Sequence, residues 1–122
     1  MKYCIPGTLA TLAFLCATTA FADAPTVERV STDNRGTNWT FAVTLSHPET
    51  GWDHYADGWE VLAPDGTSLG IRVLAHPHVN EQPFTRSLGS VDIPADTPYV
   101  TIRARDNVDG WFEAEYRVEL GE

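Results

Sequence analysis

The stretch TFAVTLS, residues 40–46, decides the fold class because apolar and more polar side chains alternate along it with a period of two. Phe41, Val43 and Leu45 fall on one side, and the smaller residues between them fall on the other. Successive side chains of a β-strand point to opposite faces of the sheet. The pattern therefore predicts a strand with one face in a core and the other in water.

The same alternation recurs along the chain, and no segment has a sustained helical period. Further strands are predicted at residues 26–31, 59–63, 68–75, 84–93, 100–105 and 112–120. APDG at residues 63–66 has the composition of a tight hairpin turn, and IPADTP at residues 93–98 is typical of a connection between strands. About seven short strands predict an all-β protein, an antiparallel β-sandwich of the immunoglobulin or fibronectin type III kind. Trp59 is expected in its core.

The first 22 residues have the features of a secretory signal peptide. Lys2 precedes an apolar run at residues 9–21, and the small-x-small triplet at residues 20–22 is a typical cleavage site. The apolar run is shorter than the ~20 residues that a bilayer-spanning helix needs, so no membrane anchor is expected. Cys16 follows the bulky Leu15, which argues against a lipid-attachment signal. We therefore expect a cleaved peptide at residues 1–22 and a single exported domain at residues 23–122, periplasmic or secreted.

Cysteine content and charge narrow the classes of function. Cys4 and Cys16 both lie in the predicted signal peptide, which leaves the exported domain without disulfides, thiol nucleophiles or thiolate ligands. The chain has eight Lys and Arg residues against seventeen Asp and Glu, a formal net charge of −9. This charge disfavours nucleic acid and anionic lipid as partners. No G-x-S-x-G elbow and no glycine-rich phosphate loop is present, so binding is predicted rather than catalysis, and no catalytic residue is assigned.

Strand order predicts that the histidines gather at one end of the sandwich. If the strands run alternately up and down, the loops near residues 47–57, 76–81 and 106–111 meet at one pole. All four histidines would then lie there, together with Trp52, Tyr55 and Trp111. Loops at the end of a rigid sandwich commonly carry binding sites.

Two of these histidines flank Pro77 in the sequence HPH. Residues two apart in an extended segment point to the same side, so His76 and His78 could direct both imidazoles toward one ion. His54 or His47 would supply a third nitrogen, and nearby carboxylates an oxygen. Imidazole and carboxylate ligands suit Zn²⁺ or Cu²⁺. The predicted metal-site residues are His54, His76, His78, Asp57, Glu81 and Asp106.

Other interpretations of the same pole stay open. The histidines could be hydrogen-bonded parts of the loops, with nearby acids raising their affinity for protons, or they could form a pH-sensitive contact surface. The rival function is a metal-free recognition module for a periplasmic protein, a carbohydrate or another small ligand. Its predicted binding residues are Trp52, Tyr55, Arg86 and Trp111. Arg86 shares strand parity with Phe84, so we expect it at the rim, paired with Glu81 or Asp106.

Two longer motifs, WDHYAD at residues 52–57 and HPHVNEQPFTRS at residues 76–87, resemble those of small exported bacterial proteins of unassigned function. The likeness extends to TIRARDNVDGW at residues 101–111 and covers nearly all of the predicted domain. It implies an exported single domain and assigns no activity. The shared motifs fall on the pole predicted to hold the histidines.

Overall fold

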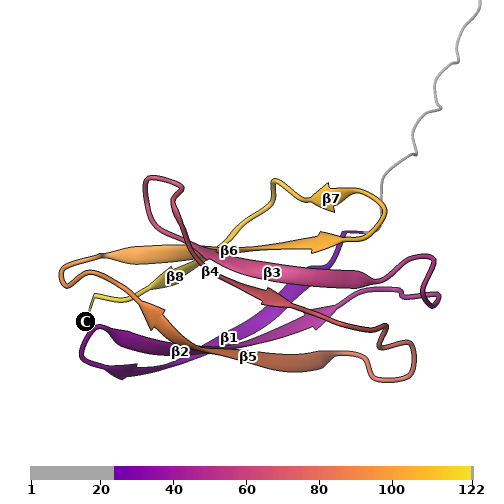
Figure 1. Ribbon diagram of the computed structural model, residues 1–122, viewed down its shortest axis with the longest axis horizontal. Helices are drawn as coiled ribbons and strands as arrows, with labels where there is room; N and C mark the ends of the chain where they lie inside the picture. The colour runs from indigo at the N-terminus through magenta and orange to yellow at the C-terminus, as the bar shows by residue number, and fades with distance from the viewer. Residues whose placement is uncertain (1–23, 122) are drawn as a thin grey trace, which may run out of the picture.

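Two antiparallel β-sheets make up residues 24–121, the part of the chain that the computed structural model describes (Figure 1). The predicted signal peptide at residues 1–22 lies outside this part. The strands are β1 (Thr26–Arg35), β2 (Asn38–Ser46), β3 (Ala56–Leu62), β4 (Ser68–Val73), β5 (Phe84–Asp92), β6 (Tyr99–Asp106), β7 (Gly110–Trp111) and β8 (Tyr116–Glu119). No helix among the described residues is long and apolar enough to cross a membrane.

The sheets have the topology of a β-sandwich. One sheet has the order β1-β2-β5, and the other has the order β4-β3-β6, with β7 and β8 both pairing with β6. The chain passes between the two sheets after β2, after β4 and again after β5, so each sheet combines strands that are distant in sequence (Figure 1). The prediction of an all-β antiparallel sandwich is confirmed.

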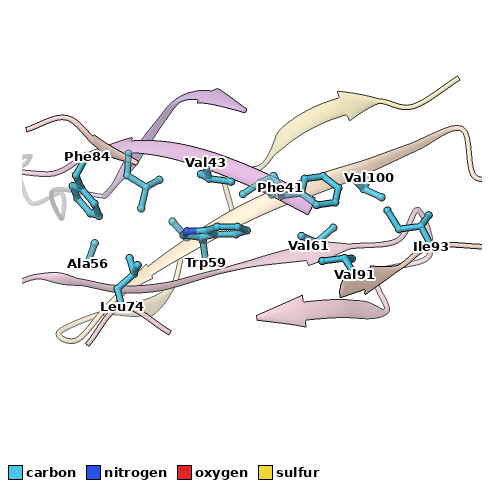
Figure 2. Close-up of a cluster of buried hydrophobic side chains, with 13 residues drawn as sticks. Phe41, Val43, Ala56, Trp59, Val61, Leu74, Phe84, Val91, Ile93 and Val100 are labelled. Carbon is cyan, nitrogen blue, oxygen red and sulfur yellow. The ribbon is translucent and has the colours of Figure 1, made fainter. Parts of the chain in front are cut away.

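The core lies between the sheets and is built by the inward faces of their central strands (Figure 2). Phe41, Val43 and Leu45 of β2 are buried, as the alternation predicts. Trp59 of β3 has no exposed surface and lies at the middle of the cluster. Truncating such a residue to alanine typically costs about 3–5 kcal/mol. Most outward residues of the sheets keep exposed surface, whereas Thr44 of β2 and Glu60 of β3 are buried beneath their partners Thr85 and Arg103.

The strand predicted at residues 112–120 is wrong in its extent. Within this range only residues 116–119 form a strand, β8, and the short strand β7 at residues 110–111 precedes it; both pair with β6. The amide of Phe112 still bonds to the carbonyl of Ala104, and pairing resumes only at Tyr116. Ala114 has the parity of a buried position but is exposed. An edge strand has one neighbour, so the chain can leave the ladder for a few residues without opening the sheet.

Three loops meet at one end of the sandwich, at the right in Figure 1. They connect β2 to β3 (residues 47–55), β4 to β5 (residues 74–83) and β6 to β7 (residues 107–109). These are the loops that the up-and-down strand order predicts to converge.

Candidate metal centre

The structure places the four histidines in two pairs at this end. The rings of His47 and His54 are nearly perpendicular, with centroids 4.8 Å apart. The rings of His76 and His78 have centroids 4.7 Å apart. The first pair belongs to the β2–β3 loop and the second to the β4–β5 loop.

Two polar residues of the site are buried because they continue the inward-facing sides of their strands. His47 follows Phe41, Val43 and Leu45 at the same two-residue spacing, and its side chain has no exposed surface. Asp106 ends β6 in the same way, after the inward-facing Val100, Ile102 and Ala104, and its side chain is also fully buried. Both side chains therefore point into the end of the sandwich, where the core stops.

Asp106 brings the two histidines of the first pair together. Its Oδ2 lies 2.8 Å from His54 Nε2 and 3.4 Å from His47 Nε2. One ligand atom from each of the three residues can be chosen so that all lie within 4.8 Å of one another. The His54 side chain is 22% exposed, so the cluster borders the solvent at that residue. His47 Nε2 is buried and makes no hydrogen bond, although Asp106 Oδ2 lies 3.4 Å away.

The second oxygen of Asp106 is held by the backbone. Oδ1 accepts hydrogen bonds from the amides of Val108, at 3.0 Å, and Asp109, at 2.7 Å. Burial raises the pKa of Asp106, but the Asp109 amide, the His54 ring and the Val108 amide together outweigh it and lower the pKa below its usual value. The carboxylate is thus ionised and fixed in orientation at neutral pH.

Glu49 is the other buried carboxylate of this end. Its Oε2 lies 3.0 Å from His47 Nδ1 and accepts the amide of Ala56 at 2.7 Å. Its Oε1 accepts the amide of His78 at 2.6 Å. The side chain has no exposed surface, so these three contacts take the place of hydrogen bonds to water.

His78 is packed rather than hydrogen-bonded through its ring. The imidazole stacks on Phe84, with centroids 4.0 Å apart and planes 12° from parallel, and neither ring nitrogen has a hydrogen-bond partner. Burial, with smaller contributions from the charges of Arg86 and His76, lowers the pKa of His78. His78 is therefore neutral near pH 7.

The structure divides the predicted metal-site residues between different contacts. It brings His54 and Asp106 together, with His47 beside them. His76 is exposed, its Nδ1 3.1 Å from the carbonyl of Pro77. The remaining two acids form ion pairs with arginines: Asp57 with Arg105 at 2.8 Å, and Glu81 with Arg86 at 3.1 Å.

The residues predicted to bind a metal-free partner are also separated. Trp52 is 66% exposed and contacts Tyr55 edge to face, with centroids 5.5 Å apart. Trp111 lies on the outer side of the β6 edge, where the guanidinium groups of Arg103 and Arg105 lie 4.8 and 5.3 Å from its ring centre. Arg86 is partly exposed and pairs with Glu81, which is one of the two partners predicted for it.

The predicted metal-site set lacks two buried residues of this end of the sandwich. It includes His47 only as an alternative to His54, and it does not include Glu49. Their signal is parity: both continue the buried side of β2 past its last apolar residue, Leu45. A histidine and a glutamate at consecutive inward positions require partners, because an unpaired buried polar group is costly.

Comparison with known proteins gives one partial relative. No protein-family profile matches the chain, and no solved structure matches it. A protein of Halomicrobium mukohataei described as "Putative lipoprotein" is 42% identical to the chain over 71 residues. The aligned part is 58% of this chain and 34% of that protein, so the chain spans about a third of the relative's length.

Proposed function

We propose that the protein is an exported domain that binds one divalent transition-metal ion through His47, His54 and Asp106. Two imidazoles and one carboxylate oxygen form a ligand set that suits Zn²⁺ or Cu²⁺. Both histidines come from the β2–β3 loop and Asp106 comes from the end of β6, so the ligands are held at the end of a rigid sandwich. Three protein ligands leave a fourth position for water or a ligand group, and the partly exposed His54 borders solvent on that cluster.

The observation that carries the proposal is the contact between His47 and Asp106. A buried imidazole nitrogen and a buried carboxylate oxygen lie 3.4 Å apart without a hydrogen bond. When the proton of His47 is on Nδ1, beside Glu49, the lone pair of Nε2 faces the anionic carboxylate and is repelled, and low polarity strengthens the repulsion. A cation shared by both atoms removes this cost. The 3.4 Å between His47 Nε2 and Asp106 Oδ2 also matches a metal centre, since bonds of ~2.0–2.1 Å place tetrahedral ligands roughly 3.3 Å apart. The hydrogen bond of 2.8 Å between His54 and Asp106 would open when an ion binds.

Export is supported by two separate features. The first 22 residues have the sequence of a signal peptide. The partial relative is described as a lipoprotein, which is an envelope-associated class of protein. The sequence around Cys16 favours cleavage without lipid attachment, so we propose a periplasmic or secreted protein.

Metal titration with matched variants tests the proposal. The protein is purified without a polyhistidine tag, stripped with a chelator and titrated with Zn²⁺ and Cu²⁺ against a chromophoric competitor. We expect one equivalent to bind. Loss of an outer-shell partner costs roughly 10- to 100-fold in metal affinity, so loss of a ligand in His47→Gln or Asp106→Asn should cost about 100-fold or more.

His76→Gln is the matched control, because His76 lies at the same end but outside the three-residue cluster. Its affinity should equal that of the wild type. The reverse result, with affinity lost in His76→Gln and kept in His47→Gln, would move the site to the HPH loop. Wild-type protein that binds neither ion would reject the proposal, provided that its circular dichroism shows it folded.

A metal-free recognition module is the second candidate, and the exposed Trp52 favours it. A tryptophan that is 66% exposed beside a tyrosine could stack on a sugar ring. Trp111 and Arg86 contribute less, because both already have partners within the chain. Quenching of tryptophan fluorescence by oligosaccharides, lost in Trp52→Ala and kept in the metal-site variants, would support this function.

A further inference from the structure

Glu49 makes three contacts at this end of the sandwich. Its two oxygens accept the amides of Ala56 and His78, and Oε2 also contacts His47 Nδ1. The three partners lie in different segments: the start of β3, the β4–β5 loop and the β2–β3 loop. A fully buried carboxylate with three donors is satisfied without water.

These contacts determine where the proton of His47 lies. An amide N–H can only donate, so Glu49 acts as an acceptor through both oxygens. Because both oxygens of Glu49 already accept backbone amides, this geometry favours a carboxylate that accepts a proton from His47 Nδ1 over a carboxyl group that donates one to it. A neutral imidazole protonated at Nδ1 has its lone pair on Nε2. Nε2 is the atom that faces Asp106 at 3.4 Å.

We infer that Glu49 is a positioning residue that holds His47 in the Nδ1–H tautomer and so presents Nε2 as a ligand atom. The inference rests on the proposed metal site and adds the residue that orients one of its ligands, His47. Histidine ligands typically donate their other ring N–H to a carboxylate or carbonyl, which fixes both the tautomer and the ring plane. Glu49 also holds the amide of His78, so the HPH loop is attached to the same carboxylate as the site.

The tautomer of His47 can be read directly in the wild-type protein. Two-bond and three-bond nitrogen–proton correlations of the metal-stripped, ¹⁵N-labelled chain distinguish a protonated Nδ1 from a protonated Nε2. We expect the imidazole of His47 to carry its proton on Nδ1, with the lone pair on Nε2. An Nε2–H tautomer, an imidazolium, or rapid exchange between tautomers would overturn the inference. This readout does not depend on whether any variant folds.

Glu49→Gln tests the consequence for binding. A glutamine offers one acceptor oxygen in place of two, so it cannot accept from all three donors. We expect its affinity for Zn²⁺ to fall roughly 10- to 100-fold, with His47 no longer held in one tautomer. Glu81→Gln is the matched control, since Glu81 is an exposed acid of the β4–β5 loop that pairs with Arg86. It should leave both the affinity and the tautomer unchanged.

The two proposals can fail separately. Wild-type protein that binds Zn²⁺ through His47, with equal affinity in Glu49→Gln, would overturn the role of Glu49 and keep the proposed function. Wild-type protein with His47 in the Nδ1–H tautomer, released in Glu49→Gln, but without metal binding would support the positioning role and reject the metal site.

Discussion

His47 and Asp106 are polar residues at positions that their strands bury. Each follows three apolar residues at the same parity, one set in β2 and the other in β6. Burying a polar group without a partner costs several kcal/mol in an apolar environment, so such positions are normally apolar or fully paired. At this end of the sandwich, two such residues meet with one nitrogen unpartnered. A metal ion would supply the missing partner.

His78 gives a prediction about acid stability. Its pKa is lowered from 6.5 in the folded protein, first by burial, then by Arg86 and His76, and against the opposing charges of Glu49 and Glu81. The unfolded chain therefore binds a proton at this residue more tightly than the folded chain. Stability should fall as the pH decreases below about 6.5, toward the lower folded pKa.

His78→Gln should reduce this loss, because glutamine does not titrate. The measurement is the free energy of unfolding in urea at about pH 7 and about pH 5, with a chelator present so that metal release does not contribute. An equal loss in wild type and variant would show that His78 does not carry this pH dependence.

At the scale of elements, the β6–β7 turn fixes the loop that carries His54. Asn107 accepts the amide of Tyr55 at 2.8 Å through Oδ1 and donates its own amide to the Tyr55 carbonyl at 3.1 Å. Its Nδ2 also donates to the carbonyl of Trp52 at 3.0 Å. The loop that carries both histidines is thereby joined to the turn that directly follows Asp106.

Asn107→Ala should weaken metal binding without unfolding the domain. The variant loses the side-chain bonds to Trp52 and Tyr55, while Asp106 and both histidines remain. We expect the free energy of unfolding to fall by about 1 kcal/mol per lost hydrogen bond. The metal affinity should fall several-fold, because the loop that carries His54 is less firmly held. Hydrogen exchange at the Tyr55 amide should accelerate. Unchanged exchange and unchanged affinity would show that other contacts hold the loop.

The sequence predicts the elements better than the site, for a physical reason. Alternation reports which face of a strand is buried, and this placed TFAVTLS and the β6 strand correctly. The same pattern cannot show where an edge strand leaves the ladder, so residues 112–120 were predicted as one strand. It also cannot show distances across loops. The HPH motif drew attention to His76 and His78, whereas His47 was recognisable only from its parity with Leu45.

At the scale of the whole molecule, the acidic surface opposes folding. A net charge of −9 on a chain of 122 residues repels itself in the compact state. The arginines reduce this locally, as in the exposed pairs Arg35–Asp33 and Arg117–Glu119, but a surface ion pair contributes only about 0–1 kcal/mol. Dissolved salt screens this repulsion and should therefore stabilise the folded protein.

Salt should accordingly raise the melting temperature. We expect an increase of several degrees between about 0.02 M and about 1 M NaCl, because the Debye length shortens from roughly 20 Å to about 3 Å. KCl at the same concentrations is the control and should have the same effect, since screening does not depend on the cation. A melting temperature that falls with salt would show that the ion pairs outweigh the repulsion.

Anomalous diffraction from crystals of the metal-loaded protein tests most directly whether one metal ion binds between His47, His54 and Asp106. Data collected on either side of the zinc or copper absorption edge locate the ion without reference to the protein atoms. We expect a single strong anomalous peak about 2.0–2.2 Å from Nε2 of both histidines and from a carboxylate oxygen of Asp106. A peak at His76 and His78 instead, or a metal-soaked crystal without a peak at this cluster, would contradict the proposed site.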